Sequence, residues 1–206
     1  RVLSKVQDFF TKHNANIHRG VHTLSVEATE MVDEARTKVA NFIGARVDET
    51  IFVRNATEAL NLVAYTWGEA NIKKGDAIII SLLEHHSNLV PWQELCKRKG
   101  AELRMIKVDE QGRLELKNSK TQELETMKAE GFKLKMGSLE SLLDDKVKLV
   151  AVTAVSNVLG TITPMKEIVN LVREKTQAKI LVDACQMVPH MPTDVKKLGV
   201  DFIAFS

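Results

Sequence analysis

The sequence predicts an α/β fold, a doubly wound and mainly parallel sheet with helices on both faces. Short runs of isoleucine, valine and leucine alternate with segments of helical periodicity, and polar turns separate them. Strands that are apolar on both faces are typical of a parallel sheet covered by helices. The run 180–182 is the clearest of them, because it leads directly into a single carboxylate, Asp183.

Six segments are expected to be strands, namely 51–53, 77–81, 102–108, 147–153, 180–182 and 201–206. Polar and apolar residues alternate along 102–108, which predicts a strand at the edge of the sheet. A short amphipathic helix is expected over 1–14, and a longer one over 25–44, capped by Ser25 or Thr29 and ended by Gly44. Further helices are expected over 55–64, 91–99, 138–143, 164–177 and 195–198.

The composition excludes several classes of protein. The 206 residues carry a formal net charge of +2, so no general attraction to nucleic acid is expected. There is no apolar run long enough to span a bilayer and no signal-peptide segment. Cys96 and Cys185 lie far apart without metal-ligand spacing. We therefore expect no metal site, two structural cysteines and a cytoplasmic location, with a processed organellar form as the alternative.

One segment, 116–136, differs from the rest because it is polar and rich in lysine and glutamate. Such a composition favours a solvated surface, and we expect an insertion that is helical if it is regular at all. Partner binding through this segment is the alternative.

Polar residues follow the apolar strands at one end of the predicted sheet. They are Thr57, His85, Asn157, Asp183 and Ser206. In open α/β sheets, ligands bind outside the carboxyl ends of the strands. Independent turn caps would explain each residue alone, but the set favours one shared site for a phosphorylated ligand that also carries a cation.

Three places in the sequence keep two interpretations each. Asp183 either caps a turn or faces a bound cation. A buried carboxylate is costly unless a cation or several hydrogen-bond donors meet it. The segment 55–58 is either a simple N-cap or an anion site built from helix amides and the Thr57 hydroxyl. The loop with His18, Arg19 and His22 is either a polar surface or a source of cations for an anionic ligand.

Six motifs then appear in order along nearly the whole chain: HRGVHTLS, NATEALNLVA, EHHSNLVPWQ, AVSNVLGT, VDACQMVPH and DFIAFS. With them the sequence resembles the pyridoxal-phosphate-dependent cysteine desulfurases and selenocysteine lyases, of the class V aminotransferase group. The motifs EHHSNLVPWQ and VSNVLG are similar to those of the branch that supplies sulfur for iron–sulfur cluster assembly. The segment 116–136 falls outside the resemblance.

The resemblance implies pyridoxal 5'-phosphate as the cofactor and assigns a role to each site residue. Asp183 is expected to pair with the protonated ring nitrogen, and His85 to lie over the ring and help in proton transfer. Gln186 is expected to contact the ring hydroxyl, and Ala56, Thr57 and Ser206 are expected to hold the phosphate. Asn157 is expected to lie near the ring and the substrate carboxylate, and Arg19 to contact substrate or an interface.

The resemblance also implies features that lie outside these residues. In the family, the stretch that matches DFIAFS continues as Gly-His-Lys, whose lysine forms the Schiff base, and the persulfide cysteine and a small carboxyl-terminal domain follow. We therefore expect residues 1–206 to be part of the large domain, inactive alone. The parent is expected to be a homodimer that converts L-cysteine to L-alanine and passes sulfur to an acceptor protein. A selenocysteine lyase, another class V enzyme or a non-catalytic scaffold are the alternatives.

Overall fold

The computed structural model describes residues 1–117, 125–129 and 132–206. The chain divides into two compact units, residues 1–52 and residues 53–206, and each is described by itself. Across the described residues, no helix combines the length and the apolar character that crossing a membrane requires.

The first unit is helical. Helix α1 (Val2–Asp8) continues as a π-helical turn (Phe9–His13), and α2 (Thr23–Ile43) is followed by a 3-10 turn (Val47–Glu49). The N-cap of α2 is His22, whose Nδ1 accepts the Ser25 N–H at 3.3 Å, so the prediction of Ser25 or Thr29 as the cap was wrong. Both hydroxyls donate elsewhere, Ser25 to the Asn16 carbonyl and Thr29 to the Ser25 carbonyl.

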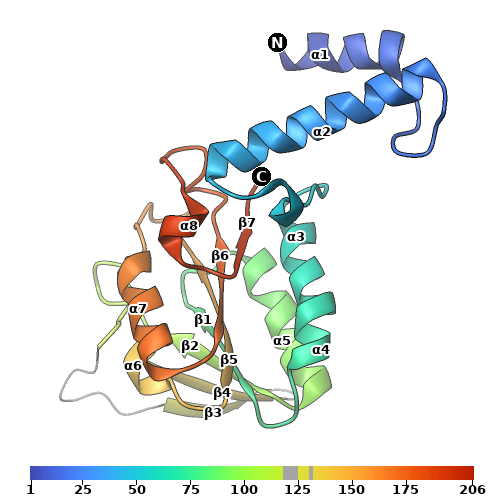
Figure 1. Cartoon of the computed structure of the whole chain (residues 1–206). Coiled ribbons are helices and arrows are strands. Elements are labelled where there is room, and N and C mark those ends of the chain that lie inside the picture. Colours follow the sequence, from blue (N-terminus) through green and yellow to red (C-terminus); the bar gives the residue numbers. More distant parts are fainter. Residues whose placement is uncertain (118–124, 130–131) are drawn as a thin grey trace. The chain divides into compact units, whose positions relative to one another are not determined.

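The second unit is built on a seven-stranded sheet (Figure 1). Its order is β3-β4-β2-β1-β5-β6-β7, and all neighbouring strands are parallel except the hairpin β3–β4. The strands are β1 (Ala77–Ser81), β2 (Glu102–Ile106), β3 (Glu125–Ala129), β4 (Phe132–Gly137), β5 (Val147–Thr153), β6 (Lys179–Asp183) and β7 (Phe202–Ala204). The predicted mainly parallel sheet is confirmed.

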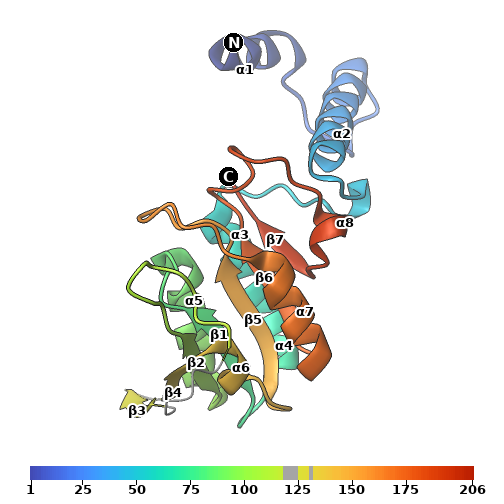
Figure 2. The ribbon, with the colours of Figure 1, turned by 90° about the vertical axis from the view of Figure 1, so that its left-hand side faces the viewer.

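Helices cover both faces of this sheet (Figures 1 and 2). On one face lie α5 (Val90–Lys99) and a continuous helical stretch made of α3 (Ala56–Val63), a π-helical segment (Ala64–Gly68) and α4 (Glu69–Asn71). On the other lies α7 (Met165–Lys175), with the short helices α6 (Leu139–Leu142) and α8 (Val195–Leu198). A 3-10 turn, η4 (His86–Asn88), joins β1 to α5.

The core follows the alternation of the strands. Ile78, Ile80, Leu149 and Leu181 pack against the helices on the α3 and α5 face, together with the fully buried Trp92. At Gly68 an added Cβ would lie 2.7 Å from the Leu95 side chain, so this glycine allows the π-helical segment to approach α5 closely. These contacts hold the start of α3 beside the carboxyl ends of the central strands.

Three sequence-based predictions about strands were wrong. Residues 51–53 form no strand, and Ile51 and Phe52 stay exposed without a neighbouring strand to bury them. The segment 116–136 contains strands β3 and β4 in place of the expected helix, although 118–124 and 130–131 lie outside the described residues. Strand β2 is an inner strand, because β4 pairs with it on the side where the edge was expected.

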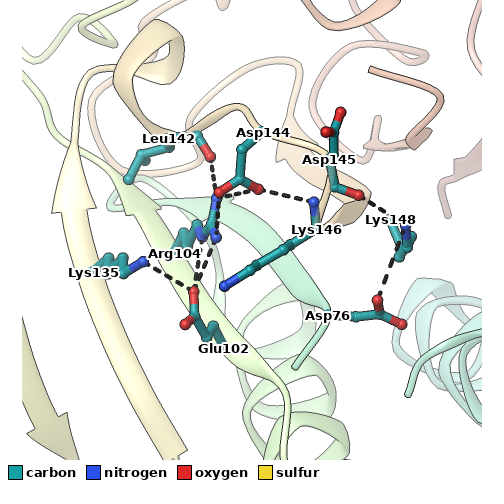
Figure 3. A network of polar contacts seen from close by, with 9 residues as sticks. All are labelled: Asp76, Glu102, Arg104, Lys135, Leu142, Asp144, Asp145, Lys146 and Lys148. Atoms are coloured by element: carbon teal, nitrogen blue, oxygen red, sulfur yellow. Dashed lines mark hydrogen bonds and ion pairs between the residues drawn. The ribbon is translucent and has the colours of Figure 1, made fainter. Parts of the chain in front are cut away.

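The polar residues of β2 are buried because they neutralise one another (Figure 3). Arg104, 2% exposed, donates to Glu102 at 2.9 Å, to Asp144 at 3.0 Å and to the Leu142 carbonyl at 2.5 Å, and Lys135 lies 3.2 Å from Glu102. Burial acts to raise the pKa of Glu102, but the cations outweigh it and the pKa is lowered. The alternation of polar and apolar residues along β2 therefore arises from a buried ion network and not from a solvent-exposed edge.

Candidate functional site

The sheet has a topological switch point between β1 and β5. From β1 the chain proceeds outward to β2 and β4, and it then returns to the other side of β1 to form β5, β6 and β7. Ligands of open α/β sheets bind in the crevice at such a point, outside the carboxyl ends of the strands. The segments that follow the adjacent strands β1, β5 and β7 carry, respectively, His85, Asn157 and Ser206, and β6 ends with Asp183.

His85 is held in one orientation by the turn that follows it. Its Nδ1 accepts the Ser87 N–H at 3.2 Å and lies 2.8 Å from the Ser87 hydroxyl. A backbone N–H can only donate, so Nδ1 is the acceptor and the neutral ring carries its proton on Nε2. The imidazole thus presents an N–H on its free side.

A pocket of 400 Å³ contains both His85 and Thr57. Its walls come from the helical stretch that starts at α3 and from η4 and α5; Tyr65, Val90 and Arg98 also line it. This volume is within the range of small-molecule sites, about 300–1,000 Å³. Two residues predicted from separate motifs therefore share one cavity.

The N-terminus of α3 lies next to the end of the chain. Asn55 Oδ1 accepts the Glu58 N–H at 2.9 Å, so Asn55 caps the helix, and the anion site at 55–58 stays a prediction. The neighbouring Ala56 N–H donates to the Ser206 hydroxyl at 3.1 Å, so an amide of the helix start and a hydroxyl after β7 meet. Thr57 is exposed at this helix start, and because 51–53 is not a strand, the prediction that Thr57 follows one was wrong.

Asp183 is buried at the end of β6, 4% exposed. Its Oδ1 accepts the Cys185 N–H at 3.1 Å, so the carboxylate does cap a turn. Within the described ranges no lysine or arginine forms an ion pair with it. Asp183 does not line the 400 Å³ pocket. A carboxylate this buried and without a cation suits a cationic ligand group.

Cys185 connects Asp183 to Ser206. Its thiol interacts with both residues, and its pKa is raised to about 12, first by burial and then by the nearby Asp183 charge. A thiol with this pKa stays protonated at neutral pH and is a poor nucleophile. The Ala184 N–H donates to the Ala204 carbonyl at 2.8 Å, and the Ser206 hydroxyl accepts the Ala56 N–H, so hydrogen bonds connect the carboxyl ends of β6 and β7 to the start of α3.

Glu84 is a site residue that the sequence reasoning missed. Its carboxylate accepts from the Ser81 hydroxyl at 2.5 Å, the Asn88 amide at 2.6 Å and the Thr153 N–H at 3.0 Å. Burial raises its pKa to about 7 against these hydrogen bonds, and the Asp183 charge adds to the rise. Its position directly before His85 in the EHHSN motif was the available signal.

The remaining predicted residues are less tightly placed. Asn157 is exposed in a turn after β5, where the Ser156 hydroxyl accepts the N–H groups of Val158 and Leu159. Gln186 is half-buried just after Asp183. Arg19 is exposed and belongs to the first unit, so its role stays a prediction. No group of three or more metal-ligating side chains occurs within residues 1–117, 125–129 and 132–206.

The chain matches one protein family over almost its entire length. Residues 1–129 and 119–206 match the family described as Aminotransferase class-V. A probable cysteine desulfurase of Synechocystis is 45% identical over 206 residues, and a cysteine desulfurase of Shigella sonnei is 44% identical over 207. Both alignments cover 100% of this chain but only 44% and 46% of the relative, so the chain spans less than half their length.

Solved structures give the same similarity in three dimensions. The apo cysteine desulfurase of Thermococcus onnurineus superposes with a TM-score of 0.83 at 39% identity, covering all of this chain and 46% of that one. A NifS-like protein superposes with a TM-score of 0.83 at 29% identity and is covered to 51%. The similarity therefore extends across all 206 residues.

Proposed function

Because the chain belongs to the class-V aminotransferase family, we propose that the full-length protein is a pyridoxal-phosphate-dependent cysteine desulfurase. It would convert L-cysteine to L-alanine and retain the sulfur as a persulfide. The observation that carries the proposal is the arrangement at the switch point. Asp183 is buried there, no lysine or arginine of the described residues pairs with it, and the end of the neighbouring strand β7 meets the start of α3 through Ser206. Identities of 44–45% to curated cysteine desulfurases support the choice of reaction.

The donor set fits the two charged ends of pyridoxal phosphate. The Ala56 N–H, the Thr57 hydroxyl and the Ser206 hydroxyl are clustered at the N-terminus of α3, where the helix dipole favours an anion. At the other end, Asp183 would pair with a ring N–H that carries positive charge. When bound, the cofactor supplies an electron sink for negative charge at the substrate α-carbon.

The residues of this chain have distinct tasks in that arrangement. The Asp183 carboxylate would hold a proton on the ring nitrogen of the bound cofactor, since an opposite charge nearby favours the charged form of each group. His85 would cover one ring face and offer its Nε2–H for proton transfer. Gln186 would donate to the ring hydroxyl oxygen and Asn157 would contact the substrate carboxylate, while Arg19 would reach substrate or a subunit interface.

The proposal extends to substrate, partners and location. L-cysteine is the proposed substrate because the curated relatives are cysteine desulfurases. The EHHSNLVPWQ and VSNVLG motifs support delivery of the sulfur to an acceptor protein for iron–sulfur cluster assembly, by a homodimer. Two free cysteines support a reducing compartment, and we propose the cytoplasm.

The test is an assay of the full-length protein loaded with pyridoxal phosphate. Incubation with L-cysteine and a thiol reductant should release alanine and sulfide in equal amounts. Selenocysteine serves as the competing substrate, and a large preference for it in kcat/KM would identify a selenocysteine lyase. If the protein forms no alanine from either substrate, the proposed function is wrong.

A further inference from the structure

A hydrogen-bond network that is mostly buried joins the loop of His85 to the two central strands. Its members are Ser81 at the end of β1, Glu84, Asn88 in η4, Trp92 in α5 and Thr153 at the end of β5. Ser81 and Thr153 are 2% and 6% exposed, and Asn88 and Trp92 are 0% exposed. The carboxylate of Glu84 is the acceptor on which three of the four bonds converge.

Glu84 occupies the switch point itself. The pairing of β1 with β5 extends to Ile79 and Val150, and closer to the carboxyl ends the Thr153 N–H is met by Glu84 Oε1 at 3.0 Å. The same oxygen accepts from Ser81 on β1. One carboxylate oxygen therefore ties together the ends of the two strands between which the sheet reverses its order.

The other oxygen of Glu84 fixes the turn that carries His85. The Trp92 indole N–H donates to Asn88 Oδ1 at 2.9 Å, and an indole N–H can only donate. The amide of Asn88 is therefore oriented with its Nδ2 toward Glu84 Oε2, at 2.6 Å. The Asn88 N–H in turn donates to the His85 carbonyl at 2.8 Å, which connects the network to the histidine backbone.

We propose that Glu84 is a positioning residue that sets the height and orientation of His85 above the ligand site by clamping η4 to the ends of β1 and β5. Every partner of the carboxylate is a donor, so the network requires an acceptor at both oxygens. A misplacement of about 1 Å can cost about 100-fold in rate, which makes such a clamp relevant to catalysis. The effect on rate rests on the proposed function, whereas the clamp itself does not.

Two variants of the full-length protein test the clamp. Glu84→Gln keeps an acceptor for Ser81 and Thr153 but turns an N–H toward the Asn88 amide, so two donors face each other. The double variant Glu84→Gln/Asn88→Asp exchanges the amide and the carboxylate between the two positions and restores the lost bond. The introduced amide then donates to the introduced carboxylate, whose other oxygen accepts from the Trp92 indole. Glu174→Ala, at an exposed position of α7, is the matched control.

We expect Glu84→Gln to lower kcat about 10- to 100-fold with a small change in KM, and to alter the visible circular dichroism of the bound cofactor. The double variant should regain most of both signals, and Glu174→Ala should match the wild type. The proposal is overturned if Glu84→Gln keeps the wild-type kcat and dichroism, or if the double variant folds and restores neither. Near-UV circular dichroism of the apo-protein reports the Trp92 environment even if wild-type protein proves inactive on cysteine, which separates failure of the clamp from failure of the proposed function.

Discussion

The two carboxylates near the switch point are stabilised in different ways. Asp183 accepts the Cys185 N–H in a turn, while Glu84 accepts three hydrogen bonds from strand ends and η4. For Glu84, burial outweighs those donors and raises the pKa to about 7, and the Asp183 charge contributes. A cation that pairs with Asp183 would reduce this repulsion, so ligand binding would favour ionised Glu84.

The raised pKa of Glu84 predicts a pH-dependent stability. Below the ordinary pKa of 4.5 the group is protonated in both the folded and unfolded states. Between 4.5 and about 7 the unfolded state releases a proton that the folded state retains, so the free energy of unfolding falls as pH rises. The loss should amount to roughly 3 kcal/mol.

Urea unfolding of wild-type and Glu84→Gln apo-protein at pH 5 and pH 8 measures this loss. The difference between the two proteins should shift by roughly 3 kcal/mol in favour of Glu84→Gln at the higher pH. Any constant cost of the glutamine cancels in that comparison. An unchanged difference at the two pH values would show that Glu84 titrates normally.

At the residue scale, the sequence predicted where several candidate site residues lie better than it predicted their hydrogen-bond partners. His85, Asp183 and Ser206 lie at or just after the ends of strands, because strand ends are recognisable from apolar runs that stop at a polar residue. Ala56 and Thr57 lie at the start of a helix, and the strand predicted before them is absent. The His22 cap and the Glu84 network were missed, since both depend on side-chain hydrogen bonds; the motif places Glu84 beside His85 but does not show which groups its carboxylate accepts from.

At the scale of the element, β2 shows how a buried ion network can imitate an exposed edge. Arg104 connects β2 to the residues after α6, and Lys135 connects β4 to Glu102 (Figure 3). Alternation of polar and apolar residues normally indicates one solvated face. Here the polar face is covered, and its charges pair within the protein.

Removing Arg104 should therefore be costly. Arg104→Met removes the guanidinium from the buried Glu102, which keeps its ion pair with Lys135, and from Asp144, whose side chain is 48% exposed. We therefore expect a loss of about 2–3 kcal/mol, less than the roughly 3–5 kcal/mol for breaking a fully buried pair. Urea unfolding of the variant measures the change in the free energy of unfolding. Lys148→Met is the control, because Lys148 is part-exposed and 4.0 Å from Asp76, and its loss should cost at most about 1 kcal/mol. Equal effects of the two substitutions would contradict a buried network.

At the scale of the whole sheet, the alternation of strands and helices predicted the fold class, and the strand order could not be read from it. The hairpin β3–β4 falls in a polar segment, where lysine and glutamate suggested solvent. Phe132 and Leu134 nevertheless pack against the core and extend the sheet beyond β2. The prediction for 51–53 was wrong in the opposite sense, because a strand was expected and none formed. Three apolar residues make no strand without a neighbouring strand to pair with.

The strand order decides which residues lie together at the candidate site. Four adjacent strands, β1, β5, β6 and β7, bring their carboxyl ends together at the switch point, and the start of α3 meets the last of them through Ser206. We propose that this edge binds a ligand with a phosphate at one end and a cation at the other, and that Asp183 holds the cation.

Titration of the full-length apo-protein with pyridoxal phosphate tests this claim most directly. Asp183→Asn keeps the shape of the side chain but removes its charge, and Asp145→Asn, at an exposed position, is the control. We expect Asp183→Asn to weaken the affinity for the cofactor at least about tenfold, or about 1.4 kcal/mol, while Asp145→Asn binds like the wild type. Equal affinity of the Asp183→Asn variant and the wild type would contradict the claim.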